Sequence, residues 1–118
     1  MAKRPDGALE HDILTVLWAA DGPLQPGDVQ DRLSVALAYT SIATVLGRLH
    51  TKGLVTRIGV GRAFAYSATY DESQLAARRI GEVLSEASDR TAVLAGFVGS
   101  LSRRELTALR ALLGEAPR

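Results

Sequence analysis

The sequence predicts a mainly α-helical protein with one small β-hairpin: a winged helix-turn-helix over residues 1–70, followed by a helical dimerisation segment over residues 71–118. Three observations support this fold class. The hydropathy pattern orders the first elements as helix, connector, helix, helix and hairpin, which is the winged-helix plan. The middle of the chain is basic and lacks acidic residues, and the remainder carries only amphipathic helical patterns.

The first two predicted helices are separated by a turn. Large apolar residues recur every three or four positions over residues 8–20, which indicates one amphipathic helix, and Asp21-Gly22-Pro23 ends it. Pro26 suits the first turn of a second helix, where its missing N–H removes no hydrogen bond. We expect this second helix to end at residues 36–38.

A third helix and a hairpin follow. The helix is predicted to run from residues 39–40 to Lys52, and Gly53 is placed to end it in the left-handed conformation. Alternating apolar residues at 54–58 and 62–67 then predict two strands, with a tip at Gly59-Val60-Gly61. The spacing i, i+3, i+4, i+7 predicts the buried face of the third helix: Ile42, Val45, Leu46 and Leu49.

Three amphipathic helices are predicted in residues 71–118. Capping boxes at residues 71–74 and 102–105 open the first and the third, and the second covers residues 91–101. Short helices without a disulfide or a metal do not hold together alone, so their apolar faces must meet a second copy or the rest of the chain. We expect dimerisation through Leu75, Ile80, Val83, Leu84, Leu94, Phe97, Val98, Leu101, Leu106, Leu109, Leu112 and Leu113.

Charge is distributed unevenly along the chain. Residues 1–31 carry two basic and six acidic residues, a net charge of −4, and residues 71–118 carry seven of each. Residues 32–70 carry five basic residues and no acidic one, a net charge of +5. A stretch of this length without a carboxylate predicts a polarised surface, and its partner is expected to be an anion.

Several classes of function are disfavoured. The chain has no cysteine, which excludes disulfides, thiolate metal sites and a cysteine nucleophile. His11 and His50 have no partners at metal-ligand spacing, and no catalytic triad or phosphate-binding loop is present. We therefore expect no enzyme, no cofactor and no metal. No apolar run approaches the ~20 residues of a membrane helix, and the N-terminus lacks a secretory stretch, so we expect a cytoplasmic protein without membrane contact.

The outer face of the third helix has the residue types of a DNA-recognition helix. A recognition helix reads base edges from its N-terminal half, where a threonine methyl can contact thymine and a hydroxyl can hydrogen-bond. A solvated polar face is the alternative, but glutamate and lysine, the better helix formers, are missing from it. The first residues of the helix suit phosphate contacts. The predicted DNA-contacting residues here are Tyr39, Thr40, Ser41, Ala43, Thr44 and Arg48.

The hairpin contributes two further candidates, Arg57 and Arg62. Arginine suits the phosphates or the minor groove that a wing covers. A charged edge strand that blocks aggregation is the alternative explanation for the same residues. Phe64 and Tyr66 share one face of the hairpin, and we expect them to be core residues rather than groups that stack on bases.

Residues 39–53 read Y-T-S-I-A-T-V-L-G-R-L-H-T-K-G. This stretch resembles the recognition helix of the penicillinase repressor family, with its common pattern Y-T-T-V-x-T-x-L-x-R-L-x-x-K-G. Residues 61–66 resemble the family's wing and residues 9–18 its first helix, and the resemblance covers essentially the whole chain. It implies a homodimeric transcriptional repressor that binds inverted-repeat operator DNA and controls antibiotic-resistance or related stress genes.

The resemblance also implies a release mechanism. Relatives commonly leave DNA when a membrane-bound sensor protease, switched on by a β-lactam, leads to cleavage of the tail before a phenylalanine and typically after an asparagine. The matching position here is Gly96-Phe97, which departs from the asparagine–phenylalanine pattern. The copper-responsive branch of the family has a cysteine-rich tail, and this chain has no cysteine.

Two other functions stay open. One is a small-molecule-sensing regulator with a ligand site at the dimer interface, although the tail has few polar groups among its apolar positions to define a pocket. The other is a winged-helix protein-interaction module that never touches DNA. The acid-free stretch at residues 32–70 argues against this second function.

Overall fold

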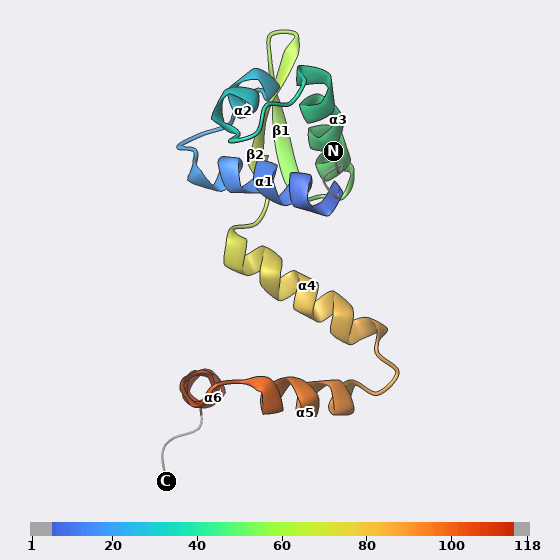
Figure 1. The fold of residues 1–118 in the computed structure, drawn as a ribbon, viewed down its shortest axis with the longest axis vertical. Coiled ribbons are helices and arrows are strands. Elements are labelled where there is room, and N and C mark those ends of the chain that lie inside the picture. Colours follow the sequence, from blue (N-terminus) through green and yellow to red (C-terminus); the bar gives the residue numbers. More distant parts are fainter. Residues whose placement is uncertain (1–5, 115–118) are drawn as a thin grey trace. The chain divides into compact units, whose positions relative to one another are not determined.

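The computed structural model describes residues 6–114, which form six helices and one two-stranded antiparallel hairpin (Figure 1). The chain divides into two compact units, the first ending at Ala76 and the second beginning at Ala77. The domains predicted from the sequence include residues 1–5 and 115–118, which lie outside the described residues. Within residues 6–114, no helix has the length and apolar character needed to cross a membrane.

The first unit packs three helices against the base of the hairpin. Each helix contributes fully buried aliphatic side chains to one core, and the buried face of the third helix is the one that its spacing predicted. The opposite face of that helix is therefore left outside. The elements of this unit are α1 (Asp6–Ala19), α2 (Pro26–Arg32), α3 (Tyr39–Thr51), β1 (Val55–Val60) and β2 (Ala63–Ala68).

Helix α2 is shorter than its sequence predicted. It ends at Arg32, and the prediction of an end at residues 36–38 is wrong. Leu33 is already extended, with φ −72° and ψ 142°, and its N–H makes the last helical bond. The Gln30 side-chain amide then donates to the Leu37 carbonyl over 2.8 Å. A side chain of α2 thus donates a hydrogen bond to the connector between α2 and α3.

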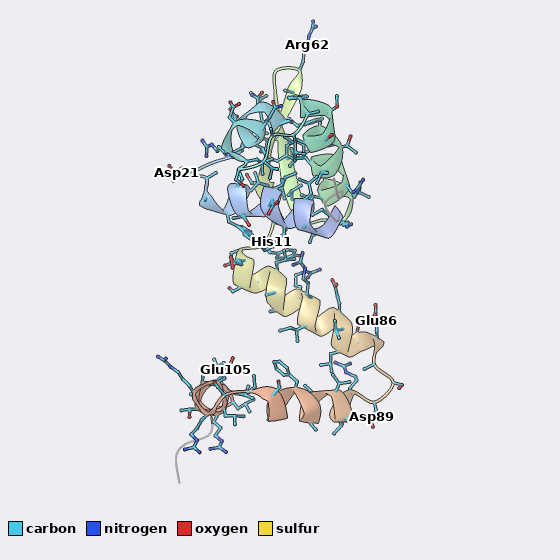
Figure 2. The ribbon with its side chains drawn as sticks, in the orientation of Figure 1. His11, Asp21, Arg62, Glu86, Asp89 and Glu105 are labelled. Atoms are coloured by element: carbon cyan, nitrogen blue, oxygen red, sulfur yellow. The ribbon has the colours of Figure 1, made fainter. Side chains whose placement is uncertain are left out.

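The tip of the hairpin lies nearer β2 than predicted. The strands stay paired up to Val60 and Ala63, so the turn is Gly61-Arg62 and the predicted tip at residues 59–61 is wrong. Gly61 has φ +61° at the first central position, which is where a type II′ turn requires glycine. Arg62 therefore occupies the tip itself, and Figure 2 shows it projecting away from the fold.

Two contacts hold the hairpin to the rest of the first unit. Leu24, in the connector before α2, exchanges both backbone hydrogen bonds with Tyr66, at 2.9 and 2.7 Å, and so adds a one-residue third strand. The Trp18 indole N–H donates to the Tyr70 carbonyl over 2.8 Å, just after β2. Leu75, in the next helix, is 4% exposed and belongs to the same core.

An ion pair joins α1 to the end of α3. Lys52, the C-cap residue of α3, donates to both carboxylate oxygens of Glu10 at 2.9 Å. The Glu10 residue is 8% exposed, so its charge is largely removed from water and depends on this partner. The pair fixes the C-terminal end of α3 against α1.

The helices after the hairpin begin at well-formed caps but bury little. The capping boxes predicted at Asp71 and Ser102 are both present, with reciprocal hydrogen bonds of 2.8–3.1 Å. Asp89 adds a cap that was not predicted, accepting from the Ala92 N–H. Within the described chain, the last two helices contain no buried residue. These helices are α4 (Glu72–Glu86), α5 (Arg90–Ser100) and α6 (Arg103–Leu112).

We expect Lys52→Met to lower the free energy of unfolding by about 1–3 kcal/mol, because it leaves the buried Glu10 carboxylate without its cation. Urea unfolding followed by the fluorescence of Trp18, the single tryptophan, measures this at a fixed protein concentration. The double variant Glu10→Met/Lys52→Met removes both charges and leaves no polar group at this position, so it should recover most of the loss. Wild-type stability of Lys52→Met alone would contradict a stabilising role for the pair.

The cap of α4 predicts a pH dependence. The Gln74 backbone N–H, and after it the Ser73 hydroxyl, donate to Asp71 and hold the pKa of its carboxyl below its ordinary value. Because folding lowers the pKa of Asp71, its ionised carboxylate stabilises the folded protein at pH values above the ordinary pKa of about 3.9. This stabilisation is lost as the pH falls through the pKa of the folded protein. In thermal unfolding, Asp71→Ala should melt below wild type at neutral pH, and the difference should shrink below about pH 4. A difference that is constant with pH would contradict it.

Candidate nucleic-acid interface

The outer face of α3 presents most of the residues that the sequence assigned to DNA contact. Its core face is buried, and a helix of 3.6 residues per turn places Thr40, Thr44 and Thr51 directly opposite. These three threonines are exposed. Ala43 is half-buried at the edge of the face. The other predicted residues of α3 are also exposed, namely Tyr39, Ser41 and Arg48.

Two threonines of this face, Thr44 and Thr51, donate their hydroxyl hydrogens to the backbone of α3. The Thr44 hydroxyl donates to the Thr40 carbonyl over 2.8 Å, and the Thr51 hydroxyl donates to the Gly47 carbonyl over 3.1 Å. Each side chain therefore offers a partner its methyl group and the acceptor lone pairs of its oxygen. A methyl suits contact with the thymine methyl, and an acceptor suits the amino groups of adenine or cytosine. The sequence pattern could not distinguish these donor and acceptor roles.

The N-terminus of α3 is open. Its N-cap residue is Ala38, no side chain of the described residues caps it, and its first turn contains no acidic residue. The unpaired first-turn N–H groups and the positive end of the helix dipole favour a phosphate at this position. Tyr39, the first residue of the helix, is 49% exposed, and its ring edge lies beside Gly27 of α2.

The two wing arginines occupy different parts of the hairpin. Arg62 lies at the tip, which in Figure 1 is at the same end of the first unit as the start of α3. Arg57 lies inside β1, opposite Tyr66, and its guanidinium carbon is 4.1 Å from the centre of the Phe64 ring. Tyr66 is in the core as predicted, but Phe64 is 44% exposed, so that expectation is wrong. Val55 is the only buried residue of β1, so most of that strand lies beyond the core.

The charge of this surface is positive. No residue from Tyr39 to Ala68 is acidic, and the side chains of Arg48, Arg57 and Arg62 are exposed. The ammonium of Lys52 is paired with Glu10 on α1. The acid-free stretch therefore places exposed basic side chains on both α3 and the hairpin.

The residues assigned to dimerisation fall into two groups. Leu75 is buried in the core of the first unit. The others are exposed or half-buried on α4, α5, α6 and the residues that follow them: Ile80, Val83, Leu84, Leu94, Phe97, Val98, Leu101, Leu106, Leu109, Leu112 and Leu113.

An apolar groove runs between α4 and α5. It has a volume of about 290 Å³, and aliphatic and aromatic groups form nearly all of its wall. Gly96 and Phe97, the predicted cleavage position, are exposed inside α5 rather than in a loop. The groove is lined by Arg79, Ile80, Val83, Leu84, Val93, Leu94 and Phe97.

The chain is similar in sequence to known transcriptional regulators. The family model of the penicillinase repressor matches residues 7–115 of the chain. The transcriptional regulator BlaI of Mycobacterium tuberculosis is 36% identical to it over 114 residues, which span 92% of this chain and 83% of the relative. The same values hold for BlaI from a second strain of that species.

Solved structures share the fold. The PcaV transcriptional regulator of Streptomyces coelicolor, in complex with its natural ligand, is 25% identical with a TM-score of 0.50, over 90% of this chain and 70% of that one. PadR of Bacillus subtilis, in complex with operator DNA, is 21% identical with a TM-score of 0.46, over 88% of this chain and 67% of PadR. The element order and the likeness to PcaV confirm the predicted fold class, a mainly α-helical winged-helix protein with one small β-hairpin.

Proposed function

Since this chain belongs to the penicillinase repressor family of transcriptional regulators, we propose that it represses transcription by binding an inverted-repeat DNA operator as a homodimer. The observation that supports DNA binding most directly is the surface of α3 and the hairpin, which carries exposed arginines, has no carboxylate of its own and lies opposite the buried face of α3. We further propose that the protein acts in the cytoplasm on antibiotic-resistance or related stress genes.

In the proposed complex, α3 lies in the major groove. Its uncapped N-terminus, with Tyr39 and Ser41, contacts phosphates and sets the register of the helix. Thr44 contacts base edges through its methyl group and acceptor oxygen, and Arg48 reaches a guanine or a phosphate further along the helix. The hairpin covers the flanking backbone, with Arg62 at its tip.

The second unit is proposed to pair two copies. Within the described chain, α5 and α6 bury no residue, although both carry large apolar side chains. Isolated helices of this length are marginal in water, and exposed apolar faces of this kind mark an interaction surface. Pairing would set two α3 helices about one DNA turn, ~34 Å, apart, so that both half-sites are read together.

Release is proposed to act through this pairing. A cut between Gly96 and Phe97 would remove the end of α5 and all of α6 from the pairing surface. Because both residues are inside α5, the helix must unwind locally before a protease can bind this bond in an extended conformation. An immunoblot during β-lactam challenge tests this part of the proposal, and a chain that stays intact while the regulated gene is induced would remove proteolysis from it.

A second candidate function is small-molecule sensing through the groove between α4 and α5. The groove has a volume of about 290 Å³ and an almost wholly apolar wall, which suits a compact apolar ligand. Thermal-shift measurements with aromatic and aliphatic carboxylates test this candidate. A saturable rise in melting temperature would support it, and a flat response across both classes would count against it.

We expect Arg48→Ala and Arg62→Ala each to weaken DNA binding, by about 5- to 150-fold if the arginine reads a base and by less if it contacts only phosphate. The probe is the set of duplexes that the wild-type protein selects from a randomised DNA library. A lost phosphate contact should also reduce the salt slope of the affinity by about one. Arg103→Ala, on α6, is the matched control. Affinity and slope that both match wild type would contradict the assignment.

Phe97→Asp should convert dimers into monomers, because the side chain is 49% exposed in the single chain and is proposed to be covered only in the pair. The same variant should lose most of its affinity for inverted-repeat DNA, since one half-site contact binds too weakly alone. Sedimentation equilibrium measures the mass, and Ser88→Asp adds the same charge between α4 and α5 as a control. A dimeric Phe97→Asp protein would place the pairing surface elsewhere.

A further inference from the structure

We propose that Phe64 is a positioning residue for DNA binding: its ring holds the Arg57 guanidinium ready to contact a phosphate. This inference rests on the proposed DNA-binding function. Phe64 calls for an explanation, because a large aromatic side chain that is 44% exposed on a strand gains little from the core. The Phe64 ring lies instead against a cation, because the guanidinium carbon of Arg57 is 4.1 Å from the ring centre.

The strand register creates this contact. Arg57 is paired with Tyr66, and Phe64 is paired with Gly59, so Arg57 and Phe64 are diagonal neighbours on one face of the hairpin. Gly59 has no side chain, and the position directly across from the ring is therefore empty of competing atoms. Tyr66 is buried beside Arg57, which closes the other side of the same face. The guanidinium is thus directed over the ring by its neighbours.

This geometry suits a phosphate contact. A cation over a ring face is attracted by the ring quadrupole, and the edges of a stacked guanidinium keep their N–H groups available. A free arginine side chain loses rotamer freedom when it binds, and a side chain held in place beforehand loses less. Phe64 would therefore raise affinity without adding a charge or a contact of its own. The competing possibility is that Phe64 itself inserts into the minor groove.

A double-mutant cycle separates these possibilities. Affinity for the duplexes selected by wild-type protein is measured for wild type, Arg57→Ala, Phe64→Leu and the double variant. Leucine keeps apolar bulk but removes the ring, so we expect Phe64→Leu to weaken binding about two- to fivefold. We expect Arg57→Ala to weaken it at least as much and to reduce the salt slope by about one. The double variant should bind no more weakly than Arg57→Ala alone.

Phe64→Trp keeps a ring for the guanidinium and should bind as tightly as wild type, with an unchanged salt slope. Arg57 and Phe64 are exposed, so the melting temperatures of all variants should match wild type. Equal losses from Phe64→Leu in the wild-type and Arg57→Ala backgrounds would overturn the inference and place Phe64 against DNA. If the wild-type protein selects no duplex from the randomised library, that result would instead contradict the proposed DNA-binding function.

Discussion

The burial of one face of α3 is the constraint on which the rest of the first unit depends. Ile42, Leu46 and Leu49 are fully inaccessible to solvent, and Lys52 fixes the end of the same helix to the buried Glu10 carboxylate of α1. With one face held in this way, the helix can neither rotate nor slide without exposing aliphatic groups or leaving a buried charge unpaired. The opposite face is therefore presented in a defined orientation, as rigid recognition of a groove requires.

Much of this arrangement follows from local sequence rules. The period of the apolar residues predicts the buried face of α3, and serine or aspartate followed by glutamate or glutamine predicts the caps of α4 and α6. The end of α2 was not predictable in the same way, because it depends on the hydrogen bond from Gln30 to the connector. The exposure of Phe64 depends on how far the hairpin extends beyond the helices, and no local pattern encodes that distance.

The two units differ in how much of their apolar surface they bury. The first unit has a continuous core that includes Leu75. In the described part of the second unit, α5 and α6 bury nothing, and α5 contains Gly96 and Gly99, which weaken a helix. If the second unit pairs two copies as proposed, control of DNA binding lies in residues 77–114, because the first unit already has a complete core. Signals that change the pairing would then change DNA binding while leaving the first unit intact.

The central claim is that two copies present two α3 helices to one inverted repeat. Selection from a randomised duplex library by the full chain, followed by sequencing, tests this most directly. The account predicts enrichment of a palindromic site whose half-sites are centred about one helical turn, ~34 Å, apart. Enrichment of a single unpaired half-site, or no enrichment at all, would contradict it.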